Sequence, residues 1–366
     1  MKVKDITNYL EEIAPLAYQE SYDNSGLIVG DSHMEVKGIM LCLDSTEEVL
    51  DEAITRGCNL IIAHHPIVFS GLKKLNGKNY IERTVIKAIK NDVAIYAIHT
   101  NLDSVLKNGV SEKIGKKIGL RDMKILSPKN GLLKKLVTFC PTAQADEVRA
   151  AIFEAGAGQI GEYDMCSFNV PGKGTFRAGE NTDPYVGNKG EMHLEDEVRI
   201  ETIYPAHLEG QILGGMIAAH PYEEVAYDIY PLGNKHNQVG LGVIGELKEE
   251  ISAEAFLQHL KTSMQPEVIR YTKLNKNKVK RVAVCGGSGS FLLNDAKAKG
   301  ADVLVTADFK YHQFFDGEGQ IMIADIGHYE SEYYTIELLS ELITKKITNF
   351  AVIFTTINTN PVKYFS

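Results

Sequence analysis

Three short stretches of the chain hold the residues best suited to chemistry: AHHP (63–66), HTNLD (99–103) and HYESE (328–332). They offer imidazole nitrogens and carboxylate oxygens, with no thiolate among them. Such ligands suit Zn²⁺, Mn²⁺ or Fe²⁺ as a bound ion better than they suit a structural zinc finger. The three stretches together therefore predict a divalent-metal site built from distant parts of the chain.

The adjacent histidines of the first stretch favour two ions over one. Neighbouring side chains of an extended backbone diverge, so His64 and His65 are poorly placed to bind a single ion. Each can instead serve one of two ions that a carboxylate bridges. Two ions about 3.5–4 Å apart can bind and activate a shared water. His328 and Glu332 are four residues apart on an expected helix, so both project to one side.

Each stretch also has a purely structural interpretation. AHHP can form a turn with hydrogen-bonded imidazoles, HTNLD can form an Asx-type turn, and HYESE can open a helix with Glu332 near its N-terminus. What favours the metal site is that all three fall at strand ends of one expected sheet, because sites in parallel sheets form outside the carboxyl ends of the strands. Other polar residues expected at these ends are His99, Thr306 and Asp308.

The elements that must position these residues alternate between strand and helix. The first third predicts strands at 38–44, 58–63 and 93–99, and helices at 45–57, 82–91 and 110–118. The helix at 45–57 begins with a Ser45–Glu48 capping box and ends at Gly57. The last third predicts strands at 280–287, 302–308, 320–327 and 350–356, and helices before Lys299, at 310–316 and at 328–343. This alternation implies parallel strands with right-handed crossovers.

The middle of the chain follows another plan. Strands are expected at 134–141, 163–170, 197–205 and 223–232, helices at 142–156 and 206–219, and a loop at 171–190. The order β-α-β-β-α-β is the split pattern of ferredoxin-like domains. We therefore expect an α/β domain formed by two halves, residues 1–129 and 241–366, with an inserted α+β domain at 130–240. Insertion is tolerated where the two ends of the insert lie close together.

Composition sets the class of protein. A length of 366 residues favours two domains, and 44% hydrophobic with 24% charged residues is ordinary for a globular protein. No apolar run approaches the ~20 residues of a membrane span, and the N-terminus lacks the pattern of a secretion signal. The five scattered cysteines indicate reduced thiols in the cytoplasm, and a net charge of −9 argues against nucleic-acid binding.

Four further features favour structural roles. CGGSGS (285–290) lacks the full spacing of a phosphate-binding loop and is expected to be a tight turn. HPYEEVAYDIY (220–230) is expected to be a helix end and an edge strand, and Cys285 has no evident base partner for a nucleophile. YDNSGLIVG (22–30) combines a turn with a strand, and its Asp23 and Asn24 are candidates to line the pocket.

YDNSGLIVG, AHHP, HTNLD, TADFKYH (306–312) and GHYESE (327–332), in this order, resemble the Ngg-interacting-factor-three-like family, often labelled GTP cyclohydrolase 1 type 2 homologs. The resemblance spans nearly the whole chain and includes the longer subtype, whose inserted domain is similar to the PII and CutA folds. Tyr22 stands where the family usually has Trp. The resemblance also implies a toroidal homohexamer with the inserted domains at its openings.

The family's dinuclear site, carried over by position, implies His65 and Asp103 on one ion and His64 and His328 on the other, with Glu332 bridging both. Two functions follow as expectations. The first is a metal-dependent hydrolase whose activated water attacks a nucleotide, as GTP ring opening would require, or another small molecule of unknown identity. The second is a non-catalytic metal-binding or regulatory protein whose inserted domain senses a ligand or partner.

Overall fold

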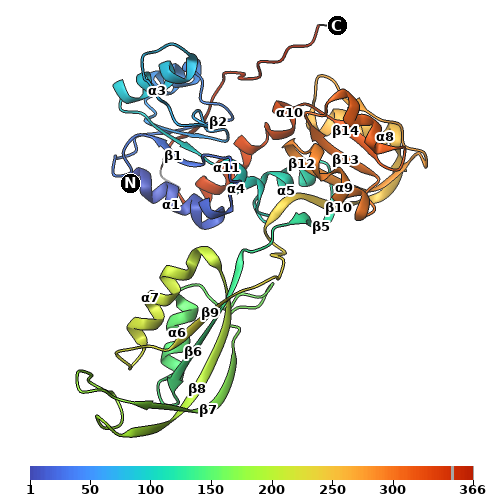
Figure 1. Ribbon diagram of the computed structural model, residues 1–366. Helices are drawn as coiled ribbons and strands as arrows, with labels where there is room; N and C mark the ends of the chain where they lie inside the picture. The colour runs from blue at the N-terminus through green and yellow to red at the C-terminus, as the bar shows by residue number, and fades with distance from the viewer. Residues whose placement is uncertain (348–349, 366) are drawn as a thin grey trace. The chain divides into compact units, whose positions relative to one another are not determined.

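The computed structural model describes residues 1–347 and 350–365, and the chain divides into two compact units (Figure 1). Residues 1–128 and 238–366 form one unit, here called the split unit, and residues 129–237 form the other, the inserted unit. Each unit has its own sheets and its own hydrophobic core. The protein is therefore a mixed α/β structure.

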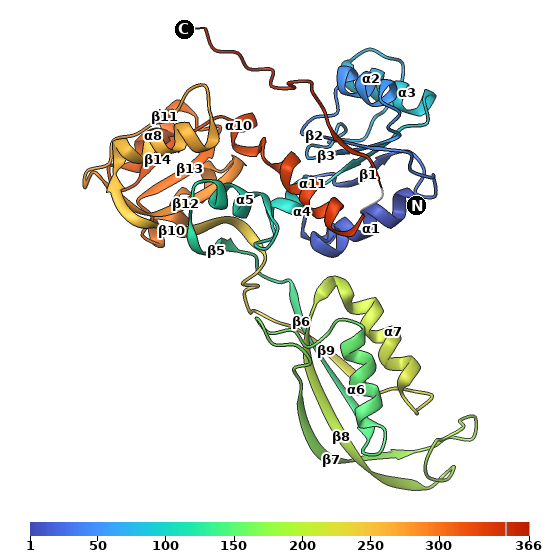
Figure 2. The same cartoon turned by 180° about the vertical axis from the view of Figure 1, so that it is seen from behind.

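The first sheet of the split unit has five strands. Their order is β1 (Gly26–Val29), β4 (Ala94–Ala97), β3 (Leu60–Ala63), β2 (Ile39–Cys42) and β15 (Val352–Phe354). All but β1 run parallel. Helices α2 (Glu47–Thr55) and α3 (Tyr80–Lys90) cover one face, and α1 (Val3–Ile13) and α11 (Thr335–Lys346) cover the other (Figures 1 and 2). The central strands are consequently buried on both faces, which explains their continuous apolar sequences.

The second sheet of the split unit has six strands. Their order is β11 (Arg270–Tyr271), β14 (Met322–Asp325), β13 (Val303–Ala307), β12 (Lys278–Ser288), β10 (Gly240–Ser252) and β5 (Arg121–Pro128). Strands β12, β13 and β14 are parallel, and the other pairings are antiparallel. Helix α9 (Leu293–Ala298) packs on one face, and α5 (Val110–Lys117) and α8 (Ala253–Met264) contact the sheet as well.

The expectation of one sheet in this unit is wrong, because the two halves of the chain form two sheets. The last strand, β15, does not extend the second sheet but pairs in parallel with β2 of the first. Alternating strands and helices predict parallel pairing without saying which strands pair. The helices α1 and α8 and the strands β5 and β10 had no counterpart in the sequence-based expectation.

The inserted unit is a four-stranded antiparallel sheet with two helices. The strand order is β7 (Phe168–Arg177), β8 (Met192–Pro205), β6 (Leu133–Pro141) and β9 (Tyr227–Pro231). Helices α6 (Ala145–Glu154) and α7 (Glu209–Ala219) pack on the sheet around a core that includes Leu136, Ile152 and Ile212. The element order is β-α-β-β-α-β, as the sequence predicts.

Three local expectations need correction. Residues 171–177 belong to strand β7, not to a loop, because an edge strand tolerates Pro171 and the glycines that argued against it. The N-cap of α2 is Thr46, not Ser45: its hydroxyl accepts from Val49 N at 3.3 Å. The helix expected at 328–343 is two helices, α10 (His328–Glu332) and α11, which are separated by Tyr333 and Tyr334.

No helix within residues 1–347 and 350–365 combines the length and apolarity needed to cross a lipid bilayer.

Candidate metal centre

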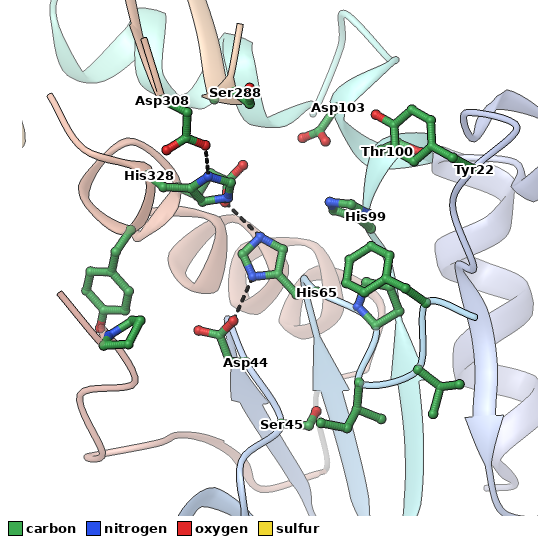
Figure 3. A pocket seen from close by; sticks show the side chains of 18 of the residues that line it. Tyr22, Asp44, Ser45, His65, His99, Thr100, Asp103, Ser288, Asp308 and His328 are labelled. Atoms are coloured by element: carbon green, nitrogen blue, oxygen red, sulfur yellow. Dashed lines mark hydrogen bonds and ion pairs between the residues drawn. The ribbon is translucent and has the colours of Figure 1, made fainter. Parts of the chain in front are cut away.

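The five residues predicted as ligands come together at the strand ends of both sheets in the split unit. His64 and His65 directly follow β3, and Asp103 ends the short helix α4 (Thr100–Asp103) after β4. His328 and Glu332 are the first and last residues of α10, after β14. Four of them, His65, Asp103, His328 and Glu332, line a cavity of about 1170 Å³ (Figure 3), and His64 is fully buried beside them. Two sheets, rather than one, thus supply the site.

The first cluster of donor atoms surrounds the buried imidazole of His64. Its Nδ1 donates to Ile98 O at 2.8 Å, so the other nitrogen carries the free lone pair. That Nε2 lies 3.7 Å from Asp103 Oδ1 and 3.7 Å from Glu332 Oε1. Among the described residues, neither His64 Nε2 nor Asp103 Oδ1 has a hydrogen-bond partner, although both are buried. Burial also raises the pKa of Asp103 to about 7.

The second cluster shares the other oxygen of the same carboxylate. Glu332 Oε2 lies 2.9 Å from His65 Nε2 and 3.1 Å from His328 Nε2. On their far sides, the two imidazoles donate from Nδ1 to Asp44 at 2.8 Å and to Asp308 at 2.7 Å (Figure 3). Glu332 therefore faces a different set of donors with each of its two oxygens.

The charges of this cluster support one another. Burial would lower the pKa of His65, but its hydrogen bonds to Asp44 and Glu332 raise that pKa to about 10. Burial would likewise lower the pKa of His328, and the bonds to Asp308 and Glu332 raise it to about 11. Burial would raise the pKa of Glu332, yet the imidazoles around it hold that pKa well below its ordinary value. A buried anion with cationic neighbours is an environment in which a metal cation can replace the protons.

This geometry does not match the pairing that the family resemblance implied. Donor atoms within 4.8 Å of one another form the sets His64–Asp103–Glu332 and His65–His328–Glu332. The expected pairs were His65 with Asp103 and His64 with His328. His64 Nε2 lies near Asp103 of α4 and near Glu332, whereas the carboxylate near His65 Nε2 is that of Glu332. The two imidazoles do not diverge as expected, because their ring centroids are 4.9 Å apart.

The donors fit a bound metal ion. Each set offers three nitrogen or oxygen ligands, and one set contains two buried atoms without hydrogen bonds, which cost free energy unless something binds them. A third set of donors within 4.8 Å consists of His64, His65 and His99.

Comparison with known proteins agrees with this architecture. The family model described as Duf34/NIF3 (NGG1p interacting factor 3) matches residues 1–361. The chain belongs to this family. A relative from Bacillus subtilis (strain 168), named "GTP cyclohydrolase 1 type 2 homolog", is 38% identical over 347 residues, which are 94% of this chain and 92% of the relative.

Solved structures of NIF3-related proteins share the fold over the full length. The Bacillus cereus protein related to NIF3 is 39% identical, with a TM-score of 0.86, covering 100% of this chain and 99% of that one. Staphylococcus aureus protein SA1388 is 31% identical with a TM-score of 0.79, again covering 100% and 99%. The split and inserted units of this NIF3 family member therefore occur together in its structural relatives.

His99 is a further imidazole of the cavity, held by a carboxylate. Asp23 Oδ1 accepts from His99 Nδ1 at 2.8 Å, and Asp23 Oδ2 accepts from the backbone and hydroxyl of Thr100. His99 extends toward the space between His65 and Asp103 (Figure 3). Asp23 thus orients the His99 ring through its Nδ1. Asn24 instead donates to Val68 O at 2.6 Å.

The glycine-rich turn after β12 makes room for the shared carboxylate. Gly287 has φ of +58°, and a Cβ built there would lie 2.3 Å from Glu332 Oε1. Its backbone N–H donates to Ser331 Oγ at 2.9 Å, and its carbonyl accepts from Thr306 at 2.9 Å. CGGSGS is therefore a tight turn, as expected, with a specific role: only glycine lets Glu332 approach the sheet so closely.

The contact of Asp44 with His65 and the place of Tyr22 in the cavity could not be predicted from the sequence. Asp44 was seen as the end of a strand, but nothing in its sequence context indicated a contact with His65. Tyr22 is 67% exposed and lines the cavity. Cys285 also lines the cavity, and burial raises the pKa of its thiol, in line with the expectation that it is not a nucleophile.

Proposed function

We propose that this NIF3 family member binds two divalent metal ions and uses them to hydrolyse a small molecule. One position consists of His64, Asp103 and Glu332 Oε1, and the other of His65, His328 and Glu332 Oε2. The observation that carries the proposal is the arrangement of Glu332, whose two oxygens face separate donor sets, one of which contains buried atoms without partners. Zinc, iron and manganese all suit these ligands.

The ions supply the chemistry, and the protein supplies the placement. A bound pair can bind a shared water and lower its pKa toward neutrality. Glu332 would hold both ions through its two oxygens, so its carboxylate would help set their spacing. His99, with Nδ1 held by Asp23, directs the rest of its ring into the cavity, where Nε2 can take up a proton released from an attacking water.

The cavity suits an organic substrate. Its volume of about 1170 Å³ is somewhat larger than the roughly 300–1,000 Å³ of typical ligand sites, so a small organic molecule fits inside it. Aromatic rings of Tyr22, Phe69 and Tyr329 line it, together with the cations of Lys73 and of Arg270, which also pairs with Asp325. Rings can stack on a planar group, and cations can pair with an anionic one. The name of the relatives, GTP cyclohydrolase 1 type 2 homolog, makes GTP the first compound to test.

We also propose the assembly and location that the family resemblance implies: a cytoplasmic, toroidal homohexamer. Residues 130–240 would fold as an inserted domain of PII or CutA type. The alternative function rests on this domain: a metal-binding regulatory protein, without turnover, whose inserted domain senses a ligand or partner.

One experiment separates the two functions. Purified protein loaded with Zn²⁺, Mn²⁺ or Fe²⁺ is offered GTP and a panel of metabolites, with Glu332→Gln as the paired control. Metal-dependent turnover that Glu332→Gln abolishes supports the hydrolase. Two bound ions with no turnover of any compound would favour the regulatory protein instead.

A further inference from the structure

The two imidazoles that share Glu332 Oε2 are each held from behind by a carboxylate, and the two carboxylates come from different sheets. Asp44 follows β2 of the first sheet and accepts from His65 Nδ1 at 2.8 Å. Asp308 follows β13 of the second sheet and accepts from His328 Nδ1 at 2.7 Å. Figure 3 shows the two aspartates at opposite ends of the row that they form with the imidazoles.

Each aspartate is itself held in place. Asp44 Oδ2 accepts from Thr359 Oγ1 at 2.6 Å, so a residue near the C-terminus fixes the carboxylate that fixes His65. Asp308 has a left-handed backbone with φ of +61°, a conformation that costs free energy in a residue other than glycine and is retained where its surroundings enforce it.

A third carboxylate ties the turn at Asp308 to the start of α10. Asp325 Oδ2 accepts from Phe309 N at 3.0 Å, and its Oδ1 accepts from Gly327 N at 3.1 Å. The residue after Asp308 and the residue before His328 are thus bonded to one side chain. The strained turn and the helix that carries the imidazole are therefore held in register.

Within residues 1–347 and 350–365, the imidazole of the other donor set has no such carboxylate support. His64 Nδ1 donates to a main-chain carbonyl, that of Ile98. A carbonyl fixes the tautomer but carries no net charge, whereas a carboxylate both orients an imidazole and makes it a stronger electron donor. Carboxylate support is hence confined to one of the two donor sets.

We propose that Asp44 and Asp308 are positioning residues for one metal position only. By accepting from Nδ1, they leave Nε2 of His65 and of His328 as the ligand atoms and aim both at one point beside Glu332 Oε2. That position then depends on side chains from both sheets and, through Thr359, on the C-terminal segment. The inference rests on the proposed dinuclear site.

The test is a Zn²⁺ titration of the full-length protein against a competing chelator. Asp44→Ala and Asp308→Ala should each raise the Zn²⁺ dissociation constant of one metal position by about 10–100-fold. The dissociation constant of the other position should stay unchanged. Asp44→Asn keeps an acceptor oxygen without the charge and should lower the Zn²⁺ affinity of that position less. Thr359→Val should have the smallest effect. The matched control is Glu195→Gln, which removes a carboxylate from His193, 2.7 Å away in the inserted unit, and should change neither constant.

A second readout separates positioning from general damage to the fold. In Zn²⁺-loaded protein with ¹⁵N-labelled histidine, NMR should show His65 protonated at Nδ1 and bound to metal through Nε2. Asp44→Ala should disturb this signature for His65 and spare that of His64. If an alanine variant does not fold, the asparagine variant gives the same comparison with the smaller shift.

The outcomes distinguish the two levels of the argument. Wild-type protein that binds no ion overturns the proposed function and the inference with it. Wild-type protein that binds two ions, with both aspartate variants at wild-type affinity, overturns the inference alone. Equal weakening of both constants also overturns it, because the support would then not be confined to one position.

Discussion

Buried polar side chains of the inserted unit and of the split unit differ in whether their polar atoms are hydrogen-bonded. In the inserted unit, both nitrogens of His220 are used: Nε2 bonds to Phe139 O at 2.9 Å, and Nδ1 accepts from Tyr222 N at 3.1 Å. In the split unit, His64 Nε2 and Asp103 Oδ1 are buried and have no hydrogen bond within the described residues. Both ring nitrogens of His220 are therefore hydrogen-bonded, whereas the cluster around His64 contains buried polar atoms without a hydrogen bond.

The difference shows what marks a site. Both units contain His next to carboxylates in sequence, so residue type alone does not separate them. His220 and its partners satisfy one another within a single sheet and its helix. The donors around Glu332 come from two sheets, converge on one carboxylate and leave polar atoms over. Buried polar groups are normally paired, so the leftover atoms indicate a missing partner.

The largest effect is expected from Glu332→Gln. This variant keeps the size of the side chain and removes the charge that offsets two neighbouring cations. Metal analysis should find the stoichiometry falling from two ions per chain to one or none. The metal-dependent gain in stability, about 4 kcal/mol when free metal is 1,000 times Kd, should shrink accordingly. Two ions held at wild-type affinity would show that Glu332 is not the shared ligand.

Double variants test which donors belong together. His64→Ala with Asp103→Asn removes two ligands of one set, and His65→Ala with His328→Ala removes two of the other. Each of these pairs should keep one ion. The crossed pair, His64→Ala with His328→Ala, should keep none. The pairing implied by the family resemblance places His64 and His328 on the same ion, so it predicts that this crossed pair keeps one ion. Ion counts by native mass spectrometry decide between the two pairings.

Asp23→Asn tests a hydrogen-bonded carboxylate of the split unit, because both oxygens of Asp23 accept hydrogen bonds. Its hydrogen bonds to His99 and Thr100 offset the effect of burial and hold the pKa of Asp23 well below its ordinary value. Loss of the charge should lower the free energy of unfolding by about 1.5–3 kcal/mol at pH 7 and leave both ions bound.

The pH dependence of this effect has a definite sign. A folded-state pKa below the unfolded one stabilises the protein at pH values above the unfolded pKa, about 3.9, and the stabilisation disappears as pH falls further. Urea unfolding of wild type and Asp23→Asn should therefore differ most at pH 7, and the difference should shrink steadily as the pH falls below about 3.9 toward the folded-state pKa. A difference that grows on acidification would contradict the assignment.

His220→Ala should give the smallest effect. Removing a satisfied imidazole leaves Phe139 O and Tyr222 N without their partners, at a cost of about 1–3 kcal/mol in stability. Zn²⁺ binding should stay at wild-type affinity in a chelator competition. Loss of an ion from this variant would mean that the histidine of the inserted unit takes part in the metal site after all.

Much of the fold follows from the sequence, but pairing between strands does not. Alternating apolar runs and amphipathic helices predict β2, β3 and β4 and their parallel order, because a buried strand and its crossover helix have distinct periodicities. The same patterns could not show that β15 joins β2, which makes two sheets of one expected sheet. Residues 171–177 of strand β7 were expected to form a loop, because proline and glycine argue against a strand although a sheet edge tolerates them.

The candidate site divides in the same way. The types and strand-end positions of His64, His65 and Glu332 indicated metal chemistry before any contact was known. Which donors face one another depends on side-chain directions at the ends of two sheets, which spacing does not contain. Asp44 and Thr359 act through contacts 21 and 315 residues apart in sequence, and no local pattern signals such bonds.

The most direct test of the account is the metal content of the wild-type protein. Purified full-length chain is stripped with a chelator, dialysed against micromolar Zn²⁺, freed of unbound metal and analysed by elemental mass spectrometry alongside His220→Ala. We expect close to two ions per chain in both proteins. Wild-type protein that remains free of metal would contradict the central claim that the donor atoms around Glu332 form a dinuclear metal site.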